Sequence, residues 1–262
     1  MPTLTWDDVG RRFYERGVDR GVLYLDNADG VAWSGLTSVS MKPVGGKPKG
    51  YYIDGVKYLN LALAEEFEGT IEAYTYPDEF AVCDGTARVH SGLFITQQAR
   101  KSFGFSYRTR VGNDIDPDYA YKIHLVYNAL ATPSERQYNS IGDNAETMDL
   151  SWDISTLPPE TTGYRRSAHL VIDTRSANPS AIADVEAVLY GDTEAAARLP
   201  TLDELVTIFD AYAVLSVTAV DADTYTIDGP DDAIVSVDAD TYTITWPSVN
   251  AVDAETYTIS SL

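Results

Sequence analysis

Residues 70–111 read TIEAYTYPDEFAVCDGTARVHSGLFITQQARKSFGFSYRTRV and combine strand, turn and strand signals in one phrase. The run 70–76 is rich in β-branched and aromatic residues, which favour strands. Pro77 is followed by two acidic residues, a pattern typical of the first turn of a helix. Residues 83–85 (CDG) are expected to end that turn. The alternation in residues 103–107 (FGFSY) then predicts a strand with one aromatic face.

The same alternation recurs towards the C-terminus. Residues 147–154 (TMDLSWDI) alternate most clearly, with one apolar face and one face that carries Asp149 and Asp153. Residues 121–128 (YKIHLVYN) alternate more weakly. Both segments are therefore expected to be strands with one side against the core.

A hairpin and a loop are predicted before the 70–111 stretch. Residues 51–60 predict a hairpin turned at Asp54-Gly55, because this pair readily adopts the positive φ of a tight turn. The preceding segment, Lys42–Gly50 (KPVGGKPKG), has the composition of a loop. Its lysines and prolines are Lys42, Pro43, Lys47, Pro48 and Lys49.

Two helices are predicted among these strands. Residues 179–190 (PSAIADVEAVLY) begin with proline and are followed by Gly191, as expected for an amphipathic helix. Residues 202–209 (LDELVTIF) are a shorter candidate. The pattern as a whole predicts a mainly antiparallel β-sandwich or barrel with one or two packing helices.

The C-terminal part contains an internal repeat. Residues 216–227 read SVTAVDADTYTI, residues 236–244 read SVDADTYTI, and residues 248–259 read SVNAVDAETYTI. Each copy predicts a strand pair with an acidic turn, and its Tyr and Ile are expected on one face. We therefore divide the chain into a β domain, 1–212, and a small acidic β appendage, 213–262. So short an appendage is marginally stable alone, and we expect it to lean on the main domain or on a neighbouring subunit.

Composition limits the class of protein. The 262 residues are 44% hydrophobic, enough for a packed core, but no apolar run reaches the ~20 residues of a membrane span. The first residues, MPTLTWDDVGRR, lack the pattern of a secretory signal. The single cysteine, Cys83, excludes an internal disulfide and indicates a small buried apolar residue in a protein made in a reducing cytosol.

The charge is strongly negative. The formal net charge is −21, and residues 199–262 contain twelve acidic residues but no lysine or arginine. Such a chain is a poor candidate for gripping nucleic acid, which requires basic residues against phosphates. Solubility is the simplest role of this charge; an acidic wall that repels passing DNA is a more specific one.

No motif indicates catalysis or a cofactor. Residues 114–118 (DIDPD) have the spacing that opens a calcium loop, but Tyr119 stands where glycine is required and Leu125 where glutamate is required. The histidines His90, His124 and His169 are far apart in sequence, with no second ligand at metal spacing. The acid pair Asp149/Asp153 is common surface chemistry. We expect no enzyme activity, no metal and no cofactor.

The basic residues near the N-terminus have two interpretations. Arg11, Arg12, Arg16 and Arg20 precede or open the first strand. Solvated charge is one interpretation. The other is contact with acidic residues of an adjacent subunit, since a strongly anionic protein that self-assembles needs complementary patches.

Several phrases of the chain together resemble a known family. Besides residues 70–111, they are FYERGVDRGVLY (13–24), YIDGVKYLN (52–60), YKIHLVYN (121–128) and AHLVID (168–173). In these phrases the chain resembles the major tail tube protein of long-tailed, siphovirus-type bacteriophages of actinobacteria. The resemblance spans roughly residues 10–210 and does not include the repeats.

The resemblance implies a β-barrel or sandwich flanked by a helix, assembled into hexameric rings that stack into a tube conducting the genome. It implies a virion tail location, self-association, and tape measure, tail terminator and tail-tip proteins as partners; DNA would pass without specific binding. Lys42–Gly50 is then the candidate inter-ring loop and residues 179–190 the flanking helix. Asp149 and Asp153 are our own candidates for the lumen wall. The repeats would decorate the exterior.

Two alternatives stay open. The chain could be a binding module on a virion or cell surface that contacts a receptor or carbohydrate through the three repeats. It could also be a tail terminator or baseplate protein of the same fold. Deletion of residues 213–262 separates the tube from the binding module, because tube assembly does not need the repeats.

Overall fold

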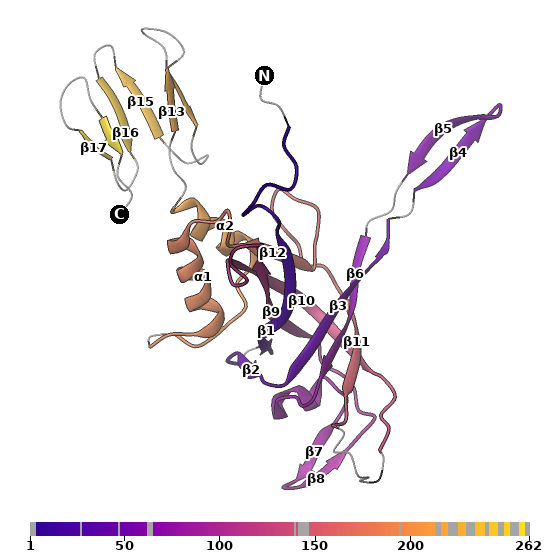
Figure 1. The fold of residues 1–262 in the computed structure, drawn as a ribbon. Coiled ribbons are helices and arrows are strands. Elements are labelled where there is room, and N and C mark those ends of the chain that lie inside the picture. Colours follow the sequence, from indigo (N-terminus) through magenta and orange to yellow (C-terminus); the bar gives the residue numbers. More distant parts are fainter. Residues whose placement is uncertain are drawn as a thin grey trace.

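A computed structural model gives the fold of the protein (Figure 1). It describes residues 4–26, 28–46, 48–61, 65–138, 140, 147–193 and 195–212, together with six short strands between residues 216 and 259.

One antiparallel sheet of eight strands dominates the molecule, in the order β2-β1-β9-β10-β11-β6-β3, with β12 also paired to β10. Its strands are β1 (Tyr14–Tyr24), β2 (Val31–Trp33), β3 (Leu36–Gly45), β6 (Glu65–Ala73), β9 (Phe103–Gly112), β10 (Ala120–Pro133), β11 (Leu150–Thr156) and β12 (His169–Asp173). The predicted mainly β, antiparallel fold is confirmed. In the part of the chain that the structure describes, β2 and β3 are the two edge strands and do not pair with each other. Of the predicted sandwich or barrel, a closed barrel is therefore not found.

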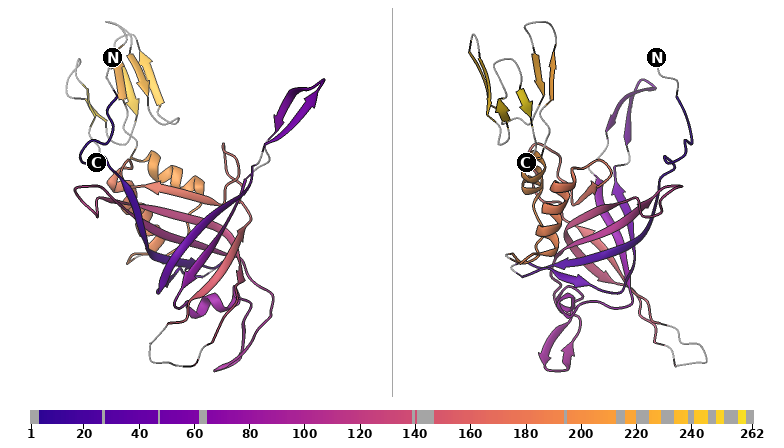
Figure 2. Two further views of the ribbon diagram at one scale, coloured as in Figure 1. Left: turned by 45° about the vertical axis from the view of Figure 1, so that its right-hand side comes forward. Right: turned by 60° about the vertical axis from the view of Figure 1, so that its left-hand side comes forward.

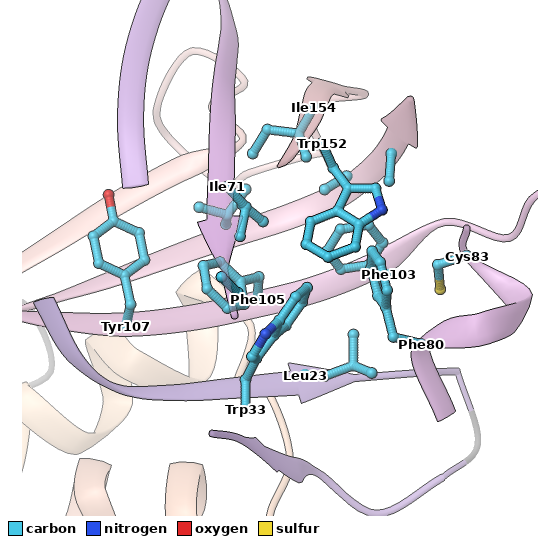
Figure 3. Packing of buried hydrophobic residues seen from close by; sticks show 14 of the residues in the cluster. Leu23, Trp33, Ile71, Phe80, Cys83, Phe103, Phe105, Tyr107, Trp152 and Ile154 are labelled. Atoms are coloured by element: carbon cyan, nitrogen blue, oxygen red, sulfur yellow. The ribbon is translucent and has the colours of Figure 1, made fainter. Parts of the chain in front are cut away.

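The inner face of the curved sheet holds an aromatic core (Figure 3). The alternation in residues 103–107 puts Phe103, Phe105 and Tyr107 into this core, as predicted. Trp33 and Trp152 pack edge to face, 5.8 Å between ring centroids. The indole Nε1 of Trp152 donates a hydrogen bond to Asp84 Oδ1 at 2.8 Å, so the buried ring has its polar group satisfied.

A short 3₁₀ helix, η1 (Asp78–Val82), covers one end of this core. Pro77 precedes it, so the helical turn predicted there is confirmed in its 3₁₀ form. Phe80 packs edge to face on Trp152, 5.2 Å between centroids. Cys83 caps the turn and is fully buried, as predicted.

Two helices cover one half of the outer face of the sheet (Figures 1 and 2). α1 (Pro179–Tyr190) has the predicted bounds and ends at Gly191, whose φ is +76°. α2 (Leu202–Asp210) begins with a capping box between Thr201 and Glu204. The helices pack on apolar residues of β1, β10 and β12, among them Ile123 and Leu125 of the predicted apolar face of residues 121–128; His124 and Val126, on the other face, are buried as well, so this strand has both sides against the core.

A long arm extends from the other half of the sheet. β3 and β6 pair antiparallel along their whole length, up to Gly45 and Glu65. Beyond these residues, β4 (Lys49–Ile53) and β5 (Val56–Leu61) form a separate two-stranded hairpin. In both views of Figure 2 this hairpin projects away from the body. Its turn is Asp54-Gly55, with φ of +50° and +79°, as predicted.

The loop prediction for Lys42–Gly50 is wrong at both ends, which belong to β3 and β4. Lys42 and Pro43 belong to β3 and pair with Glu68 and Phe67 of β6. Proline is tolerated there because β3 is an edge strand, so its missing N–H faces no further strand. Pro48 is exposed between β3 and β4, Lys49 opens β4, and Lys47 lies outside the described residues.

A second two-stranded hairpin, β7 (Ala87–His90) and β8 (Leu93–Ile95), follows η1. It lies at the opposite end of the sheet from the β4–β5 hairpin (Figures 1 and 2).

The repeats form three further hairpins, as predicted. They are β13 (Ser216–Ala219) with β14 (Tyr225–Asp228), β15 (Ile234–Asp238) with β16 (Thr241–Thr245), and β17 (Val249–Ala251) with β18 (Tyr257–Ile259). In the first and third, the register pairs Val with Ile and Ala with Tyr. The acidic turns lie outside the described residues, and the domain boundary at residue 212 stays a prediction.

Candidate assembly surfaces

The β4–β5 hairpin exposes an unusual amount of apolar surface. Val56 is 71% exposed and Tyr58 67% exposed. The other exposed apolar residues of this hairpin are Tyr51, Tyr52, Ile53, Leu59 and Leu61. A contiguous patch of this kind on a soluble protein marks an interaction site, and an isolated two-stranded hairpin is marginally stable in water. The hairpin therefore needs a partner surface.

Charged residues lie both at the base of the arm and on its hairpin. Glu66 and Glu68 lie on β6 beside Lys42 of β3, and Lys49 and Lys57 lie further out on the hairpin. Glu66 is exposed and has no ion pair among the residues described. The arm thus has carboxylates near its base, and its hairpin combines exposed apolar residues with Lys49 and Lys57.

The outer face of β3, β6 and β11 is polar and acidic. Asp153 of β11 lies beside Thr70 of β6, whose Oγ1 donates a hydrogen bond to Asp153 Oδ1 at 2.8 Å. Glu72, on the same face of β6, accepts a hydrogen bond from Ser38 Oγ at 2.7 Å. The acidic face predicted for residues 147–154 therefore continues from Asp153 onto β6, whereas β3 adds Ser38 and Lys42 but no acidic residue.

Asp149 and Asp153 differ in position. Asp153 lies within β11, whereas Asp149 is exposed just before the strand begins at Leu150. The apolar partners Trp152 and Ile154 are buried, but Met148 is 40% exposed. The alternation thus holds from Leu150 onwards.

Three of the four N-terminal arginines contact acidic residues of their own chain. Arg12 Nη1 lies 3.9 Å from Asp114 Oδ2, and Arg16 Nη2 lies 3.0 Å from Asp118 Oδ1. Arg20 Nη1 lies 3.8 Å from Glu186 Oε1 and its guanidinium lies over the Tyr190 ring. Arg11 is exposed. Contact of these arginines with an adjacent subunit stays a prediction.

A charge network that the sequence did not reveal joins β1 to β9. Asp19 accepts hydrogen bonds from Arg108 Nε at 2.7 Å and Arg110 Nε at 2.9 Å. These guanidinium donors hold the pKa of Asp19 below its usual value. The residues are about ninety positions apart, so only the strand register brings them together.

Two histidines also meet, although they are far apart in sequence. His124 Nδ1 lies 3.2 Å from His169 Nε2, and Thr109 Oγ1 lies 3.1 Å from His124 Nε2. The rings lie in a stack in which Tyr107 covers His124 and Phe67 covers His169, each with centroids 4.6 Å apart. Burial lowers the pKa of each histidine to about 4. Both are therefore neutral structural groups near pH 7.

The segment with calcium-like spacing forms a turn held by its own side chains. Asn113 Oδ1 accepts hydrogen bonds from the backbone N–H groups of Ile115 and Asp116. Asp118 is engaged by Arg16 and Arg110. Within the described ranges, no three His, Cys, Asp or Glu side chains gather as a metal site.

Neither α1 nor α2 is long and apolar enough to cross a membrane, and these are the two α-helices among the described residues.

No protein-family model matches the sequence, and no curated protein matches it.

Solved structures with low similarity come from contractile injection systems. A chain of the anti-feeding prophage baseplate is 11% identical, and the match covers 64% of this chain and 97% of that chain. A chain of an extracellular contractile injection system, in its PVC sheath-tube complex, is 12% identical over 59% of this chain and 89% of that chain. A chain of the PVC sheath/tube terminator is 11% identical over 65% and 99%. The TM-score is 0.31 for each, so the likeness assigns no function to this chain.

Proposed function

We propose that this protein is a structural subunit of a phage tail-type tube, which assembles head to tail into stacked hexameric rings. The observation that carries the proposal is the projecting β4–β5 hairpin, on which seven large apolar side chains are exposed. In the proposed assembly a different surface of the next subunit covers this hairpin, so the contact is heterologous. Such heterologous contacts build rings and filaments.

The acidic face of β6 and β11 is the proposed wall of the bore. The helices cover the other half of the outer face, so this half is the part of the sheet left bare. Glu72 and Asp153 repel phosphates, and a net charge of −21 strengthens this repulsion. DNA would then slide past without binding.

The role is mechanical, without an enzymatic step. The proposed location is the virion tail, after synthesis in the host cytoplasm. The partners are other copies of the chain and the tape measure, terminator and tip proteins of the tail. The three repeats would lie outside the tube.

Electron microscopy of the purified protein tests the proposal. We expect rings or hollow tubes both for the full chain and for a chain lacking residues 213–262. The double variant Tyr52→Ser/Tyr58→Ser removes two exposed rings from the hairpin and should raise the concentration needed for assembly at least tenfold. A matched control is Tyr138→Ser/Tyr164→Ser, because these tyrosines are equally exposed, at 76% and 74%, but lie off the arm.

The result that overturns the proposal is a monomeric full chain at high concentration, even with tail-tip and tape measure proteins added. If the repeats alone then bind cells of the host, the binding-module alternative replaces it. If the two tyrosine pairs had equal effects, the proposal of assembly would stand, but the arm would have no special part in it.

A further inference from the structure

The β7–β8 hairpin is a second apolar projection, and nothing in the proposed bore or arm uses it. Val89, Leu93 and Phe94 are each more than half exposed, and Ile95 is about half exposed. The hairpin pairs with no other strand among the described residues. As with the arm, so much exposed apolar surface indicates a docking site.

This hairpin is also basic in a strongly acidic protein. Residues 86–102 include Arg88, Arg100 and Lys101 but no aspartate or glutamate. All three side chains are exposed, and none has an ion pair in the described part of the chain. The partner that fits this surface is therefore apolar and carries carboxylates.

The hairpin is held firmly at its base. The N–H of Gln98 donates to the carbonyl of Gly85 at 2.9 Å, and the N–H of Lys101 donates to the carbonyl of Val82 at 3.2 Å. Val82 and Gly85 flank the turn whose Phe80 is buried in the aromatic core. Backbone hydrogen bonds thus join the base of the docking surface to the segment beside the aromatic core.

We propose that the β7–β8 hairpin receives the arm of a second copy of this chain, an inference that rests on the proposed head-to-tail assembly. The two hairpins lie at opposite ends of the sheet, so a copy displaced along this direction brings its arm towards the hairpin (Figure 1). The tip of the arm supplies the apolar side chains. Glu66 and Glu68 at its base supply the carboxylates for Arg88 and Arg100.

Two other occupants fit less well. A second β7–β8 hairpin would match in its apolar residues, but its three basic side chains would repel those of the first. Double-stranded DNA would match the basic residues, but it offers no surface that covers Leu93, Phe94 and Ile95. Both occupants are outcomes of the test.

The test is crosslinking between two cysteine variants of the full chain, Ser91→Cys in the turn of the hairpin and Asn60→Cys on the arm. Native Cys83 is fully buried, so it does not compete for a short thiol crosslinker. We expect a covalent dimer when the two variants are mixed and at least tenfold less when either is treated alone. A crosslink within Ser91→Cys alone would instead identify hairpin-to-hairpin contact and overturn the proposal.

Charge reversal tests the recognition itself. Arg88→Glu/Arg100→Glu should reduce the crosslink at least tenfold, and mixing with Glu66→Arg/Glu68→Arg on the arm variant should restore it. The control Arg165→Glu/Arg198→Glu makes the same change in net charge at two exposed arginines elsewhere and should have little effect.

The outcomes separate this inference from the proposed function. Rings or tubes without the mixed crosslink overturn only the docking of arm to hairpin. Monomers without any crosslink overturn both. Binding of the wild-type protein to a fluorescent DNA duplex that is lost in Arg88→Glu/Arg100→Glu would assign the hairpin to nucleic acid instead.

Discussion

The aromatic core and the β4–β5 hairpin contain the same kinds of residue in opposite environments. In the core, Trp33, Phe80 and Trp152 are almost fully buried; Trp152 packs edge to face on the other two, which pack on each other with tilted rings. On the hairpin, Tyr52 and Tyr58 are two-thirds exposed. Residue type alone thus does not tell which of these surfaces stabilises the single chain.

The difference lies in how apolar residues alternate. Strands around the core alternate between buried apolar and exposed polar positions, so one face is left for water. On β5 every residue is exposed, whichever face it occupies. We infer that the core determines the free energy of unfolding, whereas the arm contributes when a second copy covers it.

Trp152→Ala should cause the largest loss of stability, because it removes a ring that Trp33, Phe80 and Tyr76 surround. Truncation of a buried aromatic residue costs ~3–5 kcal/mol. Denaturant unfolding followed by circular dichroism measures this change. Trp152→Phe keeps an aromatic ring but loses the hydrogen bond to Asp84, and should cost clearly less. A loss below about 1 kcal/mol for Trp152→Ala would mean that the core is not the source of stability.

Local sequence signals predicted local structure well. The proline and glycine that bracket residues 179–190 fix both ends of α1, since they act through the backbone of their own turn. Asp54-Gly55 specifies its turn in the same way. The alternation in β11 identified the buried face, because the side-chain period of a strand is independent of its neighbours.

Features that depend on strand register were not predictable. The contact of His124 with His169 requires β12 to pair with β10 at one register, and no local pattern specifies it. The same holds for Asp19 with Arg108. Lys42 and Pro43 were assigned to a loop by composition, but an edge position lets a strand accept proline. Of the candidate assembly surfaces, the sequence indicated the acidic face but not its extension onto β6.

Acid should lower the free energy of unfolding of the chain through the two buried histidines, His124 and His169. The pKa of each histidine is about 4 in the folded chain, whereas its ordinary value of 6.5 applies to the unfolded chain. The unfolded chain therefore takes up protons first as the pH falls. Their contribution to stability is complete above pH 6.5 and is lost between pH 6.5 and 4. Between pH 7 and pH 5.5 the two pKa values imply a loss of about 2–3 kcal/mol.

Denaturant unfolding at several pH values measures this loss. His124→Gln/His169→Gln should remove most of the slope above pH 5.5, where carboxylates scarcely titrate. The exposed His90→Gln is the control and should leave the slope unchanged. A wild-type stability that is flat between pH 7 and 5.5 would contradict burial of the pair.

Gly55→Ala should act on the arm only. Gly55 has φ of +79°, where an alanine side chain costs about 1 kcal/mol, and there is no neighbour within 4 Å of its added Cβ. Faster hydrogen exchange at the amides of Ile53 and Val56 should report this loss, while global unfolding stays the same. Asn60→Ala, on the same hairpin, is the matched control for Gly55→Ala. Global destabilisation by Gly55→Ala would show that the arm folds as one unit with the core.

Tyr52→Ser/Tyr58→Ser should have the smallest effect on the single chain, within about 0.5 kcal/mol, because both rings already contact water. In the proposed assembly these rings become buried, so the same substitutions should weaken association at least tenfold. Denaturant unfolding of the monomer and sedimentation of the assembled protein measure the two quantities separately. Equal losses in both would mean that the tyrosines stabilise the chain itself. A loss in association alone would assign the apolar residues of the arm to contact between copies, which distinguishes them from the chemically similar residues of the core.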